Sequence, residues 1–271
     1  MDSQQAKISV VINTKNEEVN LPRLLKSIHK WVDEIIVCDM YSVDNTVNIA
    51  KKFGCKIIMH EDVGYVEPAR KLAVESTRNS WVLMLDADEL VNSDLRKWIL
   101  SKFDTPKDLP FDGVEIQWIQ YMSGTSIKYS DFGRHKHLRL FRKSMYQFSD
   151  KIHSRRVPIG KPKTISLPQS EGGVLHFNCG SFKRFLDKIN HYAYIEAGEI
   201  VKERGIYKFT FSKGVYAFLA KFLNVYIKNK GYKDGVQGLH ISICMGLYHF
   251  LVRSYALMNP LMIFIKIIKL R

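Results

Sequence analysis

The sequence predicts an α/β protein whose first half contains a parallel β-sheet, and two observations support this prediction. Strand-like and helix-like segments alternate over residues 7–60, which is typical of parallel strands joined by helical crossovers. Further along, Trp81–Leu85 is apolar at every position, as expected for a strand that is covered on both faces of a sheet. Together these patterns indicate a doubly wound sheet with helices on both sides.

The order of the elements follows from short-range patterns. Apolar residues recur at helical spacing from Leu21 onward, with Asn20 in a favourable position to cap the helix and Pro22 in its first turn. Gly54 is in position to end a second helix. The predicted elements are strands at Lys7–Asn13, Glu34–Cys38 and Cys55–His60 and helices at Leu21–Val32 and Asp44–Phe53.

Polar and acidic side chains follow three of the predicted strands at the point where each strand ends. Ligands of open α/β sheets bind outside the carboxyl ends of the strands, so these side chains are expected to share one rim. Asp86 and Asp88 are two apart on an extended backbone and face the same way, so one or both can bind a divalent cation. The other members of the rim are Thr14, Glu17, Asp39, Ser42 and Asp44.

Each acidic residue of this rim also fits a simpler role in a turn or a helix cap. Taken together they fit a nucleotide better, because its base and ribose need hydrogen-bond acceptors and its phosphates need a cation. The sequence lacks the GxGxxG and GxxxxGK[ST] patterns, so a dinucleotide site and a P-loop have no support.

Composition limits the classes of partner. The chain has 41 Lys and Arg against 27 Asp and Glu, a formal net charge of +14, which favours an anionic partner such as nucleic acid, a membrane surface or a phosphorylated substrate. Its four cysteines form no CxxC pair, so neither a zinc site nor a disulfide framework is indicated, in agreement with a reducing compartment. The first residues, MDSQQAKISVVIN, do not predict a signal peptide.

The segments VVINTKNEE, VCDMYSVDNT and ARKLAVESTRNSWVLMLDADE, in this order, resemble the GT-A domain of family 2 glycosyltransferases. The bacterial subgroup that includes lipopolysaccharide core β-glucosyltransferases is especially similar. The resemblance continues through HLRLFRK, Ile152–His153, VLHF and GYKDGVQGL and so covers nearly the whole chain. It implies an inverting transfer of a sugar from a nucleotide-sugar donor, expected to be UDP-linked, to a lipid-linked, lipopolysaccharide or capsule glycan.

The same resemblance implies roles for individual residues. Asp88 would bind Mn²⁺ or Mg²⁺, and His176 in VLHF would complete the metal shell, whereas without the resemblance a lone histidine after an apolar pair is more often structural. Arg70 in EPARKLA matches a basic position near the donor, and is otherwise a solvated helix residue. The expected donor-binding residues are Thr14, Glu17, Asp39, Asp44, Arg70 and Asp86, the last beside the ribose or the metal.

An inverting transfer needs a general base within hydrogen-bond reach of the acceptor hydroxyl, and here the sequence departs from its relatives. Relatives commonly show a His-Glu pair where this chain has His153 and Ser154, and an aspartate where it has His135. The leading alternatives for the base are Asp131 and His135, with Asp150 and His153 behind them. Each of these also fits a turn residue or a surface histidine.

The middle of the chain is expected to form the acceptor side. Gly113–Tyr121 is strand-like, and HLRLFR alternates so that Leu138 and Leu140 face one way and Arg139 and Phe141 the other. The two arginines of this segment are then either free to meet anions or part of a solvated strand edge.

The C-terminal part changes in composition after a helix expected from Ser181 to Gly205. Phe209–Ile227 is rich in aromatics and lysines, and the apolar runs of Leu239–Leu270 are interrupted or bounded by His, Arg, Pro and Lys, which disfavours a membrane span. Amphipathic helices lying on an anionic membrane surface fit better, and the alternative is that they pack on the catalytic domain or form a homo-oligomer.

We therefore expect a GT-A catalytic domain at residues 1–205 and a helical membrane-association region at residues 206–271, in a cytoplasmic protein that is peripheral on the inner face of the cell membrane. No helix-turn-helix, RRM or zinc-finger pattern is present, so nucleic acid is not an expected partner. The alternative function is a non-catalytic nucleotide-sugar-binding or scaffold protein at the membrane.

Overall fold

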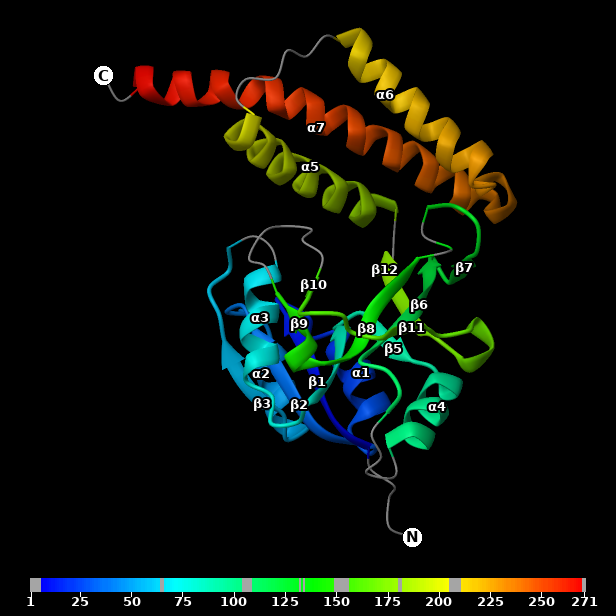
Figure 1. Cartoon of the computed structure of the whole chain (residues 1–271). Coiled ribbons are helices and arrows are strands. Elements are labelled where there is room, and N and C mark those ends of the chain that lie inside the picture. Colours follow the sequence, from blue (N-terminus) through cyan, green and yellow to red (C-terminus); the bar gives the residue numbers. More distant parts are fainter. Residues whose placement is uncertain are drawn as a thin grey trace. The chain divides into compact units, whose positions relative to one another are not determined.

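The computed structural model describes residues 6–63, 66–103, 109–131, 133, 135–148, 156–179, 182–204 and 211–269, and the chain forms two compact units (Figure 1). Unit 1 comprises Met1–Ile119 and His135–Phe177. Unit 2 comprises Gln120–Arg134 and Asn178–Arg271.

The first half of unit 1 is the predicted alternation of strands and helices. Its strands lie in the order β3-β2-β1-β4, and every neighbouring pair is parallel, which confirms the predicted parallel sheet. The elements are β1 (Ala6–Thr14), α1 (Leu21–Ile28), β2 (Val32–Asp39), α2 (Thr46–Lys52), β3 (Lys56–Met59), α3 (Glu67–Glu75) and β4 (Trp81–Asp86).

The second half of the sheet is mixed. Beyond β4 the order continues β8-β6-β12-β5, and β8 runs antiparallel to both β4 and β6. The strands are β5 (Glu89–Val91), β6 (Gly113–Met122), β8 (Lys136–Arg142), β11 (Thr164–Ser166) and β12 (Val174–Cys179), with β9 (Tyr146–Gln147) and β10 (Val157–Pro158) as a separate ribbon. The helical elements are α4 (Ser93–Phe103) and the single turns η1 (Lys143–Met145) and η2 (Gln169–Glu171).

Side chains of β4 alternate between two hydrophobic cores on opposite faces of the sheet. Trp81, Leu83 and Leu85 join a core that includes buried residues of α1 and α4, whereas Val82 and Met84 join a core that includes α3. The uninterrupted apolar run therefore arises for the predicted reason, since both faces of the strand are covered.

Unit 2 is built on three long helices. It contains β7 (Thr125–Ile127), α5 (Phe182–Arg204), α6 (Phe211–Leu223) with its π-helical continuation η3 (Asn224–Lys228), η4 (Gly231–Asp234) and α7 (Gly235–Lys269). Both α5 and α6 pack against α7 (Figure 1). The domain boundary predicted from the sequence is residue 205. Phe185 and Ile189 of α5 share a core with Val225, Ile241 and Cys244, so α5 is grouped with the other two helices.

Some predicted element ends differ from the observed ones. α1 ends at Ile28 because β2 already begins at Val32, so the predicted helix was too long. The Asn20 side chain does not cap α1, since its amide donates to Glu17 Oε2 at 2.8 Å. Gly54 follows α2 with φ +72°, the left-handed conformation expected of a glycine that ends a helix.

One segment of the described chain, Gly231–Leu257, is long and apolar enough to cross a membrane by length and composition alone. No span was predicted there from the sequence, because His240 and His249 interrupt the apolar run. One third (33%) of the 18-residue apolar window in this segment is buried inside the protein, and Ile241 and Cys244 contribute to the core of unit 2.

Candidate functional site

The carboxyl ends of three parallel strands meet at one edge of the sheet in unit 1. Thr14 at the end of β1 lies opposite Asp39 at the end of β2. On the other side of β1, Asn13 lies opposite Asp86 at the end of β4. The sheet register thus brings together the strand ends that the sequence predicted to share a rim.

Asp39 joins the loops that follow β1 and β2. Its carboxylate is fully buried and accepts hydrogen bonds from Thr14 Oγ1 at 2.8 Å, from the Ser42 N–H at 2.7 Å and from Ser42 Oγ at 2.6 Å. A carboxylate offers about four acceptor positions, so most of those of Asp39 are used within the chain. Through these hydrogen bonds Asp39 holds the loops after β1 and β2 together and so fixes the shape of the rim.

Asp44 and Glu17 are used in the same two loops. Asp44 accepts from the Thr46 N–H at 3.0 Å and from the Glu18 N–H at 3.1 Å, and Thr46 Oγ1 accepts from the Glu17 N–H at 2.8 Å. The slight desolvation of Asp44 acts to raise its pKa, but the hydrogen bonds from Thr46 and Glu18 outweigh it and lower the pKa below its usual range. Asp44 therefore has the turn and cap role that the sequence offered as the simpler alternative.

Asp86 lies between two arginines. Arg70 of α3 contacts Asp86 Oδ1 at 2.9 Å, and Arg139 of β8 contacts Asp86 Oδ2 at 3.4 Å. Arg139 also pairs with Glu89, which accepts a further hydrogen bond from the Trp118 indole and one from the Asp86 N–H at 2.8 Å. These groups form one network at the end of β4.

The network shifts the pKa values of its two carboxyl groups in opposite directions. Burial acts to raise the pKa of Asp86, but the charges of Arg70 and Arg139 prevail and hold that pKa far below its usual range. Burial raises the pKa of Glu89 to about 7, with Arg139 opposing it and the charge of Asp86 adding to it. Asp86 is thus anionic and already paired, which leaves little of its charge for a cation.

Arg139 is not at a solvated strand edge, so that alternative was wrong. Its side chain is buried because β8 lies inside the sheet, between β4 and β6. The predicted facing of the leucines was also wrong, since Leu140 belongs to one core and Leu138 packs against the other. The register between β6 and β8 shifts at this level, where an irregularity interrupts simple alternation.

Asp88 and His176 form a pair separate from Asp86. The chain turns after β4, and β12 pairs with β5 so that His176 lies opposite Glu89. His176 Nε2 is 3.3 Å from Asp88 Oδ1, and the imidazole stacks on Trp118 with ring centroids 4.1 Å apart and planes 3° apart. Asp86 and Asp88 therefore have different partners, because the extended backbone assumed from the sequence is interrupted between them.

The Asp88–His176 pair suits a divalent cation. Two ligands at right angles on an ion with bonds of about 2.1 Å are separated by about 3 Å, close to the observed distance. A carboxylate oxygen and an imidazole nitrogen are also ligand atoms that Mn²⁺ can coordinate. No cluster of three or more His, Cys, Asp or Glu side chains with metal-binding geometry occurs among the described residues.

Two basic residues near the network were not singled out from the sequence. Burial lowers the pKa of His137 to about 3, and the charges of Arg139 and other neighbours add to this effect. Arg156 donates to Met84 Sδ at 2.9 Å and lies over the Phe141 ring, and no carboxylate in the described part of the chain forms an ion pair with it. Burial, together with Arg139 and Arg70, lowers the pKa of Arg156 to about 9.

The predicted bases lie in different surroundings. Asp131, in unit 2, forms an ion pair with Lys221 at 2.5 Å and accepts from Asn229 at 2.8 Å. His135, in unit 1, is exposed, with its ring 6.1 Å from that of His137. Asp150 and His153 fall outside the described residues, as does Ser154.

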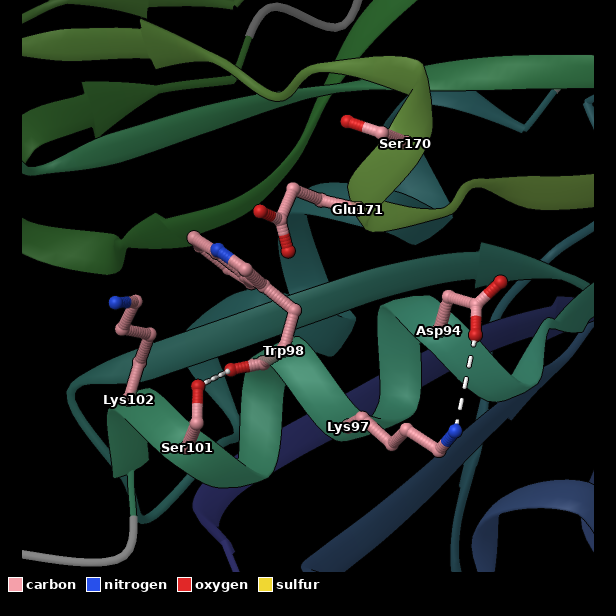
Figure 2. Close-up of a pocket in the computed structure, with 7 residues that line it drawn as sticks. All are labelled: Asp94, Lys97, Trp98, Ser101, Lys102, Ser170 and Glu171. Carbon is pink, nitrogen blue, oxygen red and sulfur yellow. Dashed lines mark hydrogen bonds and ion pairs between the residues drawn. The ribbon is translucent and has the colours of Figure 1, made fainter.

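Figure 2 shows a pocket of about 380 Å³ on unit 1 that has no part in this rim. Two pairs of its lining residues interact, with Lys97 Nζ 4.0 Å from Asp94 Oδ1 and the Ser101 hydroxyl donating to the Trp98 carbonyl at 2.7 Å. The lysine side chain is 81% exposed, so the pocket has no desolvated charge to offer a ligand. The lining residues are Asp94, Lys97, Trp98, Ser101, Lys102, Ser170 and Glu171.

The sequence model of glycosyl transferase family 2 matches residues 9–191. The chain belongs to this family. An uncharacterized glycosyltransferase of Rickettsia typhi is 28% identical over 250 residues, covering 90% of this chain and 85% of the relative. An uncharacterized glycosyltransferase of Rickettsia prowazekii is 30% identical over 202 residues. The matched region spans 73% of this chain and 69% of the relative.

A relative with a more specific name is the lipopolysaccharide core biosynthesis glycosyltransferase LpsC of Rhizobium meliloti. It is 25% identical over 256 residues, which cover 91% of this chain and 90% of LpsC. Among solved structures, that of S. aureus TarS 1–349 is 14% identical in sequence, with a TM-score of 0.46. The superposed region spans 92% of this chain and 91% of the TarS chain.

Membership in glycosyl transferase family 2 confirms the resemblance read from the sequence. The mixed α/β fold with its parallel-dominated half is the GT-A fold that the resemblance implied. The protein is a glycosyltransferase that transfers a sugar from a nucleotide-sugar donor, and the scaffold alternative is not retained.

Proposed function

We propose that this family 2 enzyme is a metal-dependent inverting glycosyltransferase that uses a UDP-sugar and glycosylates a lipid-linked or lipopolysaccharide glycan. The observation that carries the proposal is the Asp88–His176 pair, with its 3.3 Å separation, beside the arginines that follow β4. The name of LpsC supports the acceptor class.

Asp88 and His176 would hold Mn²⁺ or Mg²⁺. When bound, the cation supplies positive charge that stabilises the diphosphate as it leaves the sugar. His176 is held in orientation by its stacking on Trp118. Trp118 in turn donates to Glu89, so a continuous set of contacts links the metal pair to the arginine network.

The donor is bound by the rim. The loops with Thr14, Glu17, Asp39 and Asp44 hold the nucleoside, and Asn13 adds a buried acceptor, Oδ1, that has no hydrogen-bond partner among the described residues. Asp86 stands at the ribose side, where Arg70 and Arg139 fix its position.

Arg156 gives the site a positive charge that the described carboxylates do not neutralise. A buried cation without an acidic partner is costly, and an anionic ligand lowers that cost. The diphosphate of the donor is such a ligand, and Arg156 is close enough to Asp86 and Glu89 for their charges to act on it.

Asp131 and His135 stay the alternatives for the general base that accepts the proton of the attacking hydroxyl. His135 is exposed and Asp131 is held by Lys221. We place the enzyme in the cytoplasm, peripheral on the inner face of the cell membrane, where a lipid-linked acceptor and a nucleotide sugar meet.

The test is donor binding and transfer by Asp88→Asn and His176→Gln. Both variants are expected to lose the Mn²⁺ dependence of UDP binding in calorimetry, and Asp88→Asn to lower transfer at least about 100-fold, because charge stabilisation of the leaving group is lost. Asp94→Asn, a carboxylate on α4, is the matched control. Unchanged metal-dependent UDP affinity in Asp88→Asn would refute the proposed metal role.

A further inference from the structure

The outer face of α6 and η3 exposes a row of large apolar side chains. Tyr216, Leu219, Leu223 and Ile227 are 74%, 49%, 53% and 56% exposed, and Phe211 at the start of the helix is 72% exposed. Val215, at 37%, lies in the same row. We call these six residues the α6 stripe.

The stripe is not the face by which α6 joins the core of its own unit. Gly214 and Val225 are buried on the other side of the helix. Phe218 packs on α7 so closely that a Cβ at Gly246 would lie 2.8 Å from its ring. Because residues four apart share a helix face, the spacing of the stripe continues an apolar row that folding leaves largely exposed, although the Phe211 ring meets the Phe250 ring of α7 edge-on with centroids 5.9 Å apart.

The sequence around the stripe is mostly cationic, although Lys221 of α6 forms an ion pair with Asp131 at 2.5 Å. Residues 211–269 contain eight Lys and Arg and a single acidic residue, Asp234. The Asp234 carboxylate is already occupied by the backbone N–H groups of Lys128, Tyr129 and Ser130. Lys213 lies near one end of the stripe, and Lys228 and Lys230 lie at the other, all of them exposed.

We propose that the α6 stripe lies in the headgroup and acyl boundary of an anionic lipid bilayer, with its lysines on the phosphate groups. The proposal rests on the peripheral location proposed above and names the surface that produces it. Exposed Phe, Tyr, Leu and Ile beside lysines suit a helix that lies in the interface plane. Each lysine near the surface adds attraction to anionic lipid.

The same observations argue against two other occupants. A second copy of the chain would bring two cationic surfaces together, since the segment has almost no acidic residues to offset the lysines. Nucleic acid would satisfy the lysines but leave the apolar stripe in water.

Helix α7 is better explained as the support of this surface than as a membrane span. Both α5 and α6 pack against it, and Ile241, Cys244, Val252 and Ala256 are buried within unit 2. A helix that crossed the bilayer would have to leave these partners or carry them with it, including the charged residues of α5. We therefore expect the protein to be released from membranes by alkaline carbonate.

The experiment is sedimentation of the full-length protein with vesicles of phosphatidylcholine alone or mixed with phosphatidylglycerol. Binding is expected with the anionic vesicles and is expected to weaken in high salt. Leu219→Ser with Leu223→Ser should lower partitioning at least about tenfold, because two apolar side chains no longer enter the boundary. Val157→Ser with Ile159→Ser, at 52% and 41% exposure in unit 1, is the matched control.

Several outcomes would overturn the proposal. Equal vesicle binding by the stripe variant and the parent protein would remove the stripe from the interface. Retention after carbonate treatment would favour a spanning α7. A dimer that forms without lipid and is lost in the stripe variant would assign the stripe to a second copy. The assay contains no donor or acceptor, so its failure is separate from failure of the proposed transfer reaction.

Discussion

Glu89 in unit 1 and Asp234 in unit 2 both fix neighbouring backbone, but they do so with different partners. Glu89 is fully buried and faces the Arg139 guanidinium, the Trp118 indole and the Asp86 N–H. Asp234 is partly exposed and accepts from the backbone N–H groups of residues 128–130 at 2.8 to 3.2 Å.

The difference concerns what remains when one partner is removed. In unit 1 the charges are out of water and each compensates another, so removal of one leaves a buried charge. In unit 2 the acceptor binds uncharged backbone amides, so its loss leaves no buried charge, and the amide of the exposed Lys128 can turn to water. The rim at the strand ends of unit 1 is therefore held by buried charges whose loss is costly, and the loop that carries Asp131 is held by hydrogen bonds whose loss costs less.

Arg139→Met provides the strongest test of the first half of this comparison. It leaves Glu89 and Asp86 without their shared cation in a buried site, so the free energy of unfolding is expected to fall by about 3–5 kcal/mol. Equilibrium unfolding in urea measures this change. Transfer activity should fall as well, because the position of Asp86 depends on the same guanidinium.

Arg142→Met is the matched control on the same strand. Its guanidinium is 3.5 Å from Asp112, and both side chains are 27% exposed, so the loss should be about 1 kcal/mol or less. Equal losses in the two variants would show that burial of the charges does not govern their energetic role.

Asp234→Ala tests the part of the comparison that concerns unit 2. The loop at residues 128–130 loses its acceptor, and the expected cost is about 1–3 kcal/mol, smaller than for Arg139. Hydrogen exchange should accelerate at Lys128, Tyr129 and Ser130, with little change in the strands of unit 1. Asp94→Ala, 58% exposed with a 4.0 Å ion pair, serves as the control with no expected change. Faster exchange throughout unit 1 would contradict a local role.

His137→Gln tests how the arginine network affects a neutral neighbour, through an effect that appears only as the pH falls. The folded-state pKa of His137 is lowered to about 3 from 6.5, so below pH 6.5 the unfolded chain binds a proton that the folded protein does not. Stability supplied at neutral pH is thus lost as the pH falls, by up to about 1.4 kcal/mol per unit.

Between pH 7 and pH 5 the variant should therefore lose about 2 kcal/mol less than the parent protein. Urea unfolding at pH 8, 7, 6 and 5 measures the difference. Parallel pH profiles for the two proteins would show that His137 titrates normally in the fold.

The sequence was sufficient for the parallel half of unit 1, because its pattern is local. Trp81–Leu85 shows the period of a strand covered on both sides, and the residues after it necessarily fall at the rim. That Asp88 and His176 lie together was expected only through the family resemblance, because they are distant in sequence and the pairing of β5 with β12 brings them close.

Arg139 shows why the rest could not be predicted. Alternation in HLRLFR indicates a strand but does not tell an interior strand from an edge, so the burial of Arg139 and its pairing with Glu89 depend on long-range sheet order. The same holds for α5, whose apolar face fits either unit until the core with Val225 and Ile241 is known.

The pairing of β5 with β12 has one more consequence. Backbone hydrogen bonding, including that from the Phe177 N–H to the Asp88 carbonyl at 3.0 Å, sets the spacing of Asp88 and His176. If the two side chains hold a divalent ion, as proposed above, the main chain sets the spacing of the ligands before the ion arrives. The ion would then need little rearrangement of the chain to enter or leave.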